Sequence, residues 1–406
     1  MSSEVLGLRG LNRALLDRQM LLRRTALPDA ATLPDAETRA KPGIETPAER
    51  VAETRAGRVA ETRAGQVIET VEHLAGLQAQ APFPPYYGLW SRLEGFRPDD
   101  LAELILDRRV VRIALMRGTI HLVSARDCLM LRPLLQPVLD RGLNVVFGPQ
   151  LAGVDRVALA AAGRLLVEGT PMTFSELGAR LSETWPDHPP AALAQAVRAL
   201  VPLVQVPPRA VWGAAGRAAH TSAESWLGRP LDRDPPLEPV VIRYLAAFGP
   251  ATVRDIYAWC HLPGLREAAD RLRPSLRTYH DEHGNELIDL PDAPRPDPDQ
   301  PAPVRLVAEF DNLLLSHADR TRVISEQNRR RLYTRNGIFP GTVLVDGFVL
   351  GIWRITRSRG AATLTFEMFE SISKRNRDAV AREGERLLAF AAAASPVRDI
   401  RFEPIT

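Results

Sequence analysis

Two glutamines, Gln78 and Gln80, could take part in chemistry because they lie two residues apart just before Pro82. Each side-chain amide oxygen accepts two hydrogen bonds, so the pair can orient a water molecule and place partial negative charge beside a reacting atom. An amide is not a base near neutral pH, so such a pair suits only a bond that is already activated for cleavage. The spacing alone is more simply explained by two solvated polar residues at the end of a helix.

Further polar candidates lie along the chain. His121 belongs to a predicted strand, where a packed or capping histidine is the alternative to a contacting one. Asp311, His317 and Arg320 follow another predicted strand, but no nucleophile elbow with Ser or Cys accompanies them, so a hydrolase triad is not indicated. We expect this set to form either a structural polar cluster at a domain junction or contacts to a phosphate backbone.

Basic residues and a residue of a predicted hairpin complete the candidates for nucleic-acid contacts. An arginine run beside Tyr333 can contact phosphates or form a solvated loop. The dipeptide Asp346-Gly347 predicts a tight hairpin turn, whose tip can probe a groove or simply close a sheet. The candidate nucleic-acid contacts are Arg117, His121, His317, Arg320, Arg330, Arg331, Arg335 and Phe348.

Composition permits nucleic-acid binding without demanding it. The 406-residue chain has a net charge of +3 and a sequence pI of about 9.1. Lys41 and Lys374 are its only lysines. GC-rich coding is one explanation for this bias; the other is that arginine forks suit phosphate groups better than lysine does.

Several protein classes are excluded by the sequence. No apolar run reaches the ~20 residues of a membrane span, and residues 1–10 lack the apolar core of a secretory signal. Cys128 and Cys260 are the only cysteines, and no residues have metal-ligand spacing. We therefore expect a cytoplasmic, nucleoid-associated protein without a metal or disulfide framework.

The first 150 residues predict a winged helix interrupted by an insertion. Helical periodicity covers residues 6–24, 66–78 and 101–107, and residues 110–123 read as two short strands. Residues 26–65 contain tandem repeats, including two copies of Val-Ala-Glu-Thr-Arg-Ala-Gly that begin at Val51 and Val59. We expect this insertion to be largely disordered.

The same order of helices and a strand pair recurs twice. In residues 151–230, a capping box at Thr173–Glu176 opens the second of three helices, and the strand pair is expected near 204–207 and 210–213. In residues 231–292, Thr252–Asp255 is expected to cap the second helix, and the wing is expected at 276–290. The sequence therefore predicts an α+β protein with about three tandem winged helices.

The C-terminal part, residues 293–406, predicts a different kind of unit. A proline-rich acidic linker at 291–303 precedes strands at 304–310, 341–355 and 362–369. An amphipathic helix at 376–394 closes the chain. We expect a small β-rich unit that resembles a half-barrel.

Four segments together resemble the AlkZ-like DNA glycosylases. The Gln-Ala-Gln sequence matches the family's Gln-apolar-Gln motif; the sister YcaQ-like branch has Asp at the second motif position, whereas this chain has Gln80. The resemblance covers most of the chain but not residues 26–65. The segments that carry it are 73–93, 117–123, 309–320 and 345–354.

The resemblance implies a function. Family members are bacterial winged-helix enzymes that excise purines alkylated at N7, and some unhook interstrand crosslinks made by natural alkylating toxins. They use no metal or cofactor, and their motif glutamines are catalytic, which carries over to Gln78 and Gln80. The implied partner is double-stranded DNA, and we expect a monomer.

The chemistry agrees with this expectation. Loss of a base passes through a sugar with oxocarbenium character, and an ordinary purine is a poor leaving group. Alkylation at N7 makes the base cationic, so a positioned water and some negative potential are enough. A lyase is disfavoured because neither lysine is well placed for a Schiff base. The alternative is a winged-helix transcriptional regulator without catalysis, since fold does not fix function.

Overall fold

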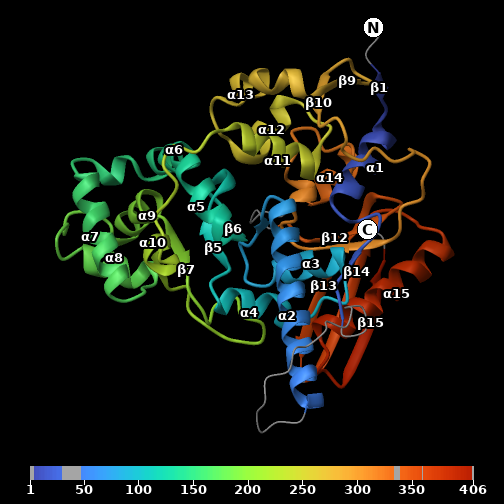
Figure 1. Cartoon of the computed structure of the whole chain (residues 1–406), viewed down its shortest axis with the longest axis horizontal. Coiled ribbons are helices and arrows are strands. Elements are labelled where there is room, and N and C mark those ends of the chain that lie inside the picture. The colour runs from blue at the N-terminus through green and yellow to red at the C-terminus, as the bar shows by residue number, and fades with distance from the viewer. Residues whose placement is uncertain (1–3, 30–46, 333–338, 359, 405–406) are drawn as a thin grey trace.

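The chain forms a mixed α+β structure, which confirms the predicted fold class. Its sheets are two of five strands, one of three strands and one strand pair, among the residues described. The number of winged-helix repeats stays a prediction. In Figure 1, residues 156–227 form the left end, residues 238–289 lie at the top, and residues 341–403 lie at the lower right. The computed structural model describes residues 4–29, 47–332, 339–358 and 360–404.

A five-stranded antiparallel sheet crosses the centre and carries the first motif glutamine, Gln78. Its strand order is β3-β6-β5-β7-β8. Since β7 pairs with β5, the strands expected as wings of two separate units join one sheet, and the expected boundary near residue 150 does not divide it. The bounds are β3 Leu77–Gln78, β5 Val110–Ala114, β6 Ile120–Ser124, β7 Leu203–Gln205 and β8 His220–Ser222.

The strand expected at residues 210–213 is not present. The partner of β7 is β8, and the segment between them is a loop in which Ala210 has a φ of 70°. A strand residue has negative φ, so this segment cannot extend the sheet. Trp212 of this loop instead packs against Tyr86, with ring centroids 4.9 Å apart.

Helices surround the central sheet on both sides. Prolines in the first turn fit α3 and α4, because the missing N–H would have no partner there. The N-cap of α5 is Ser124, whose hydroxyl accepts from the backbone N–H of Asp127. The helices are α2 Pro47–His73, α3 Pro84–Arg92, α4 Pro98–Leu106, α5 Ala125–Leu134 and α6 Gln136–Phe147.

The second and third units begin their middle helices with the predicted capping boxes. Thr173 exchanges hydrogen bonds with Glu176, and Thr252 does the same with Asp255. The helices of the second unit are α7 Arg156–Gly169, α8 Phe174–Leu181, α9 Pro190–Leu200 and α10 Ala223–Leu227. Those of the third are α11 Glu238–Phe248, α12 Val253–Cys260 and α13 Leu265–Leu272.

The wing predicted at 276–290 is confirmed as β9 (Arg277–Asp281) and β10 (Glu286–Asp289), and the start of the chain adds a third strand to it. The strand β1 (Val5–Leu6) pairs in parallel with β9. Helix α1 (Leu8–Arg18) then packs against the third unit. Residues 5–18 therefore pack with the third unit, although they precede the first unit in sequence.

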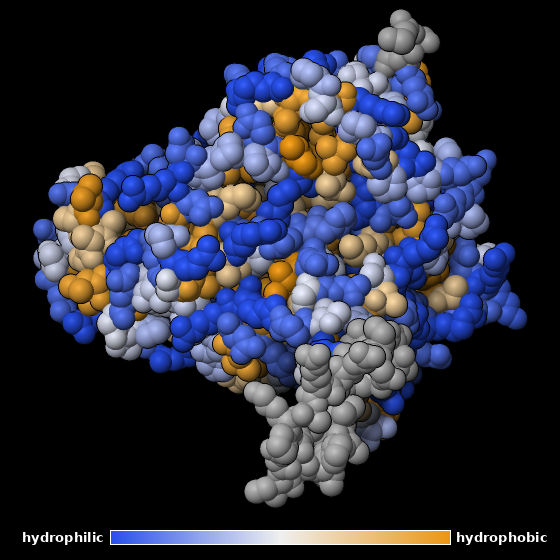
Figure 2. Space-filling model, in the orientation of Figure 1, coloured by the Kyte–Doolittle hydropathy of each residue, from blue (hydrophilic) through white to orange (hydrophobic). Residues whose placement is uncertain are grey.

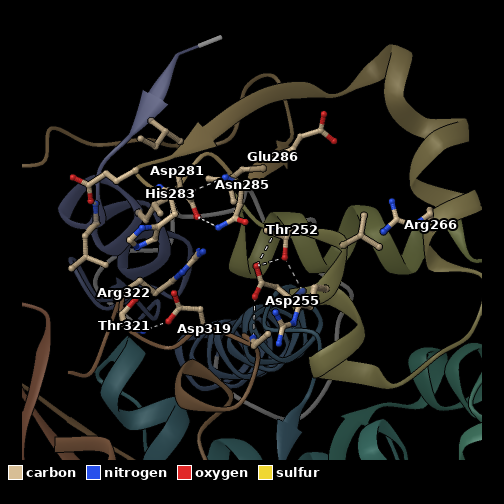
Figure 3. A pocket seen from close by; sticks show the side chains of 18 residues that line it. Thr252, Asp255, Arg266, Asp281, His283, Asn285, Glu286, Asp319, Thr321 and Arg322 are labelled. Atoms are coloured by element: carbon tan, nitrogen blue, oxygen red, sulfur yellow. Dashed lines mark hydrogen bonds between the residues drawn. The ribbon is translucent and has the colours of Figure 1, made fainter. Parts of the chain in front are cut away.

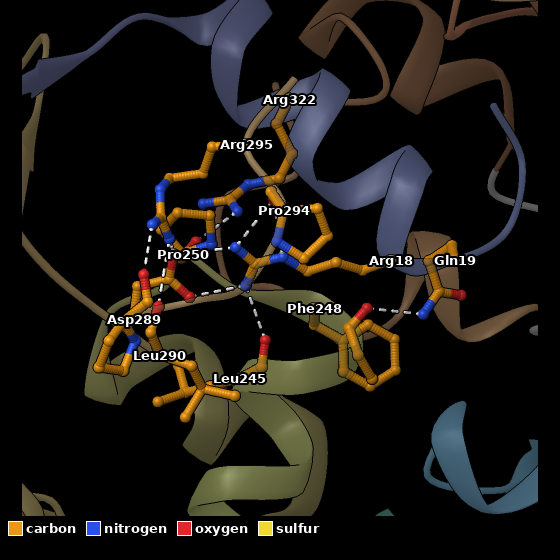
Figure 4. Close-up of polar contacts among 12 residues, drawn as sticks. Arg18, Gln19, Leu245, Phe248, Pro250, Asp289, Leu290, Pro294, Arg295 and Arg322 are labelled. Atoms are coloured by element: carbon orange, nitrogen blue, oxygen red, sulfur yellow. Dashed lines mark hydrogen bonds and ion pairs between the residues drawn. The ribbon is translucent and has the colours of Figure 1, made fainter. Parts of the chain in front are cut away.

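A buried ion pair fixes α1 in this position. Both Arg18 and Asp289 have fully buried side chains, and two hydrogen bonds of 2.7 and 2.8 Å join them (Figure 4). Arg18 also donates to the carbonyl oxygen of Leu245, while Arg295 pairs with Asp289. Removing one member of such a pair would leave an uncompensated buried charge.

The C-terminal sheet is mixed. Its order is β11-β12-β13-β14-β15, and β15 lies parallel to β14. Strand β15 was not predicted, whereas the closing helix was. The bounds are β11 Arg305–Val307, β12 Gly341–Val345, β13 Phe348–Ser358, β14 Ala361–Met368, β15 Val397–Glu403, α14 Glu326–Leu332 and α15 Lys374–Ala391; a separate parallel pair is β2 Thr25–Ala26 with β4 Leu93–Glu94.

The insertion at 26–65 is not disordered throughout, which corrects the prediction. From Pro47 onward the repeats belong to α2, since Ala, Glu and Arg are strong helix formers. In the second repeat copy, Arg63 is 5% exposed and bonds both oxygens of Asp100 at 2.9 and 2.6 Å. Residues 30–46 lie outside the described part of the chain.

The surface shows where apolar side chains remain exposed. Figure 2 shows apolar patches at the left end, where α7 lies, and Val157 and Leu165 of α7 are 80% and 75% exposed. Across the described residues, no helix has the length and apolar character needed to cross a membrane.

Candidate active site

The motif begins on an extended strand and not at a helix end: Gln78 is the last residue of β3, and Gln80 lies in a bend just after it. Helix α2 stops at His73, and Ala75 and Gly76 then take φ values of 54° and 87°. A Cβ at Gly76 would lie 2.8 Å from Val123, so this turn requires glycine. The chain enters β3 directly after the turn. The backbone N–H of Ala79 still bonds the carbonyl oxygen of Ile120, so the chain stays beside β6 past the end of β3, and both glutamines can reach the same hairpin.

Both glutamine side chains turn toward the β5–β6 hairpin. Oε1 of Gln78 accepts a 2.7 Å hydrogen bond from Nη2 of Arg117. Oε1 of Gln80 accepts a 3.3 Å hydrogen bond from the backbone N–H of Ile120. Gln78 is 8% exposed, while Gln80 is exposed. Gln78 is therefore nearly buried and Gln80 lies at the surface beside it, and both carbonyl groups bond to the protein.

Arg117 connects three parts of the chain at this point. Besides Gln78, its guanidinium donates to the carbonyl oxygen of Trp259 in α12 and to Oδ1 of Asn312, at 2.5 and 3.3 Å. Asn312 in turn donates to the carbonyl oxygen of Gly76 at 3.1 Å. The first, third and C-terminal units thus jointly position Gln78.

Two residues that the sequence analysis did not select shape the motif. One is Asn312, which follows Asp311 in the polar run. The other is Arg112 on β5, which is 3% exposed and donates to the carbonyl oxygens of Ala79 and Ala81 at 2.6 and 3.3 Å. A polar residue inside an apolar strand or apolar run was the available signal for both.

His121 is a buried neighbour of the motif and not a surface contact. It pairs with Gln78 across β6 and β3 and has no exposed surface. Burial and the nearby Arg117 lower the pKa of His121 to about 3, so the imidazole is neutral at physiological pH. Nδ1 lies 3.1 Å from the carbonyl oxygen of Thr119. A side chain buried in this way cannot contact DNA, which corrects that expectation.

The site is electropositive. Burial, followed by repulsion from Arg320, lowers the pKa of Arg117 to about 10. Arg117 and Arg141 also contribute to a lowered pKa of His261, after burial. Among the described residues, no carboxylate hydrogen-bonds to either motif glutamine or to Arg117. The side chains here can donate and accept hydrogen bonds, but none is a carboxylate base.

Comparison with known proteins identifies this arrangement. The sequence model described as DNA glycosylase AlkZ-like matches residues 71–390. The chain belongs to the AlkZ-like DNA glycosylase family. Among solved structures, the Streptomyces sahachiroi DNA glycosylase AlkZ matches with a TM-score of 0.74 and 18% identity, covering 98% of this chain and 100% of that one, so the fold is shared. No curated protein matches the sequence.

As a member of this family, the protein is an enzyme that acts on DNA. Two of the other polar residues selected from the sequence, His317 and Asp311, are buried. His317 is 2% exposed, and its Nε2 lies 3.1 Å from the carbonyl oxygen of Phe248. Burial lowers its pKa to about 3. Asp311 forms a buried bidentate pair with Arg92. His317 therefore packs inside the glycosylase and is not a DNA contact, which corrects the prediction.

The arginine run of the glycosylase is only partly described. Arg330 is exposed on α14, 3.7 Å from a carboxylate oxygen of Glu326. Arg331 donates to the carbonyl oxygen of Phe369 at 2.8 Å. Arg335 lies outside the described residues. Arg320 lies with its guanidinium 5.8 Å from the ring centroid of Phe339.

The Asp346-Gly347 hairpin of the glycosylase does not project freely. Asp346 pairs with Arg9 and Arg13 of α1 at 2.8 and 2.6 Å, and Asn12 donates to the carbonyl oxygen of Gly347. Phe348 is half-buried at the start of β13. The tip is held against α1, so the expectation that it probes a groove is wrong for this conformation.

A separate pocket of the glycosylase lies away from the glutamines. It has a volume of about 390 Å³ between the β9–β10 turn and the start of α12 (Figure 3). Asp281, Glu286 and Asp319 line it together with Arg266 and Arg322. The described residues contain no group of three or more His, Cys, Asp or Glu suited to a metal ion.

Proposed function

We propose that this glycosylase hydrolyses the N-glycosidic bond of N7-alkylated, cationic purines in duplex DNA. The observation that carries the proposal is the pair of glutamine amides held by the β5–β6 hairpin, with no carboxylate bonded to either among the described residues. Such a pair cannot activate a poor leaving group. A cationic base needs no activation, because it departs as a neutral purine.

The two amides supply what the remaining chemistry requires. Each Oε1 accepts one hydrogen bond from the protein, and Oε1 of the exposed Gln80 keeps a second acceptor position for water. The hydrogen bonds from Arg117 and from the β6 backbone hold the two amides in place, which reduces the entropy lost in positioning water and the nucleotide. The same chemistry extends to a crosslink or bulky adduct, because each linked purine there is also an N7-alkyl cation.

DNA binding is proposed to depend mainly on phosphate contacts without strong sequence preference. Arg320, Arg330 and Arg331 remain candidates, since none of them is fully buried. The logarithm of affinity should then fall steeply with the logarithm of salt concentration. Tight, salt-insensitive binding to one operator sequence would contradict this and support a regulator.

The direct test is release of 7-methylguanine from a duplex, followed by chromatography of the free base. We expect Gln78→Ala and Gln80→Ala each to slow single-turnover excision by about 10²–10³-fold, as loss of a hydrogen bond made in the transition state does. DNA affinity should change little. Gln150→Ala, at an exposed glutamine outside the site, is the matched control and should match the wild type.

Gln80→Asp sharpens the test. It keeps an acceptor oxygen and adds the negative charge of the sister branch, so it should retain more activity than Gln80→Ala. Repulsion by phosphates can weaken its DNA binding, which saturating enzyme removes from the measurement. Both alanine variants cleaving at the wild-type rate would show that the motif is structural.

A further inference from the structure

The hydrogen bond between Arg117 and Gln78 fixes which end of the amide faces outward. A guanidinium carries only donors, so the group 2.7 Å from Nη2 must be the carbonyl oxygen and not the amide nitrogen. Arg117 cannot easily swing away, because Trp259 and Asn312 also accept from it. The Gln78 amide is therefore locked with Oε1 inward.

Nε2 of Gln78 must then point away from Arg117. Within the described residues, this atom has no hydrogen-bond partner, yet it does not belong to the fully buried polar atoms that lack one. Gln78 as a whole is 8% exposed. The small open part of the side chain thus includes an NH₂ group, which offers donors to whatever occupies the site.

Charge strengthens this donor. Hydrogen bonds in a chain polarise one another, so an arginine bonded to Oε1 makes the NH₂ group more positive. Arg320 adds a second positive charge close to Arg117. A developing cation would gain nothing from these groups, whereas an electron-rich oxygen would be bound well.

We propose that Arg117 is a positioning residue that fixes Gln78 as a hydrogen-bond donor to an oxygen of the lesion nucleotide. That oxygen is either a flanking phosphate oxygen or O6 of the purine. Gln80 is then the glutamine that accepts from the attacking water. This inference rests on the proposed function, and it divides the motif into one donor and one acceptor.

Gln78→Glu tests the donor role. Glutamate keeps both the length and the acceptor that bonds Arg117, but it cannot donate near neutral pH. We expect single-turnover excision of 7-methylguanine to fall about 10²–10³-fold, as far as for Gln78→Met. If Gln78 acts as an acceptor, the carboxylate should preserve or raise the rate. A Gln78→Glu enzyme within threefold of the wild type overturns the proposal.

A double-variant cycle tests whether Arg117 acts through Gln78. Arg117→Met frees the amide to rotate, so it should slow the wild-type background by about tenfold at saturating enzyme. In the Gln78→Glu background it should have no further effect, because no donor remains to be oriented. A merely structural arginine would slow both backgrounds equally, and that result overturns the assignment. Arg117→Lys should restore part of the rate.

The two possible acceptors are separated by the substrate. A duplex with a methylphosphonate beside the lesion lacks the charged phosphate oxygen. If that phosphate is the acceptor, the wild type should slow toward the Gln78→Glu rate on this duplex; if O6 is the acceptor, the wild type should keep its rate.

A readout without catalysis separates this inference from the proposed function. The side-chain NH₂ signal of Gln78, assigned by its loss in Gln78→Glu, can be followed in protein labelled with ¹⁵N-glutamine. We expect it to shift when a duplex carrying 7-methylguanine binds. A wild type that releases no base but shows this shift defeats only the proposed function; an unshifted signal on bound DNA defeats the donor role.

Discussion

Two hairpin turns in this glycosylase have the same unusual backbone but opposite charge. In the β5–β6 turn, Arg117 and Gly118 have φ values of 56° and 72°. In the β12–β13 turn, Asp346 and Gly347 have φ values of 47° and 85°. The first tip carries a donor that reaches Gln78, and the second carries an acceptor that receives arginines from α1.

The difference shows that the β12–β13 turn holds α1 in place, whereas the β5–β6 turn positions a residue of the candidate active site. Asp tolerates the left-handed region better than most residues, so Asp346-Gly347 is a favourable turn that also closes a contact. An arginine in that region is uncommon and costs about 1 kcal/mol or more. At Arg117 the surrounding hydrogen bonds offset this strain, and the side chain reaches three units of the molecule.

Acid should act on the first hairpin more than on the second, because only β6 carries a buried histidine. His121 and, at the third unit, His317 have pKa values near 3, below the usual 6.5. The unfolded chain therefore binds more protons between these values. The free energy of unfolding should be unaffected above pH 6.5 and fall by up to about 1.4 kcal/mol per pH unit from His121 alone as pH drops toward 3, with a further loss in the same direction from His317, which Asp255 partly opposes.

Denaturant unfolding between pH 7 and pH 4.5 checks this expectation. His121→Gln and His317→Gln should each remove part of the pH slope, even though each lowers stability at pH 7. An unchanged slope in both variants would show that these histidines do not control acid unfolding.

Alanine substitution at the two turn glycines, Gly347 and Gly118, should lower the stability of the protein to different extents. A Cβ on Gly347 would lie 2.4 Å from Oδ1 of Asn12, whereas one on Gly118 would meet nothing nearer than Leu139 at 3.9 Å. Both variants have the strain of positive φ, about 1 kcal/mol. Gly347→Ala adds overpacking, for a total of about 2–4 kcal/mol. Urea unfolding measures both; equal losses would mean that α1 is not firmly docked on the second tip.

Removing the charge of the second tip should lower stability and leave excision unchanged. Asp346→Asn leaves the buried Arg13 without its carboxylate, but Asp346 itself is 45% exposed, so water screens the pair. We expect a loss of about 1–2 kcal/mol in unfolding free energy. A matching fall in the single-turnover rate would show that the two hairpins are coupled.

The smallest effect is expected from shortening the insertion. Deleting residues 30–57 retains Arg63 and its pair with Asp100, and doubling or halving a loop changes closure by only ~0.6 kcal/mol. Arg63→Ala without the deletion should be more damaging, because it leaves the buried carboxylate of Asp100 with only Arg97, whose guanidinium lies 3.7 Å away, as its charged partner. Thermal melts compare the two; a deletion product that fails to fold would show that the early part of α2 packs against the core.

Local patterns predicted much of the fold. Capping boxes at Thr173 and Thr252, and the turn at Asp346-Gly347, depend on neighbouring residues and were found as expected. The parallel strand β15 and the pairing of β7 with β5 depend on distant partners, which periodicity does not contain. The helical repeats of α2 have the polar composition of a disordered segment, and only the helix propensity of Ala, Glu and Arg indicates their structure.

The site was predicted less completely than the fold. Gln78 and Gln80 could be selected because their motif is short and contiguous. Their geometry could not be predicted, since a left-handed turn at Ala75 and Gly76 ends the helix before them and directs the chain into β3. Asn312 and Arg112 act on the motif across 236 and 33 positions of sequence, so only the fold reveals them. His121 and His317 were expected to contact DNA because the sequence alone does not reveal that both side chains are buried.

The docking of α1 sets an order on the synthesis of this protein. Asn12 bonds the carbonyl oxygen of Gly347, 335 positions later in the chain. At 5–20 residues per second, a ribosome needs roughly 15–70 s to make the residues between them. During that interval, α1 lacks the partners that it contacts in the β12–β13 turn. Helix α1 is thus secured against this hairpin only after Gly347 has been made, and until then its apolar face is available to a chaperone.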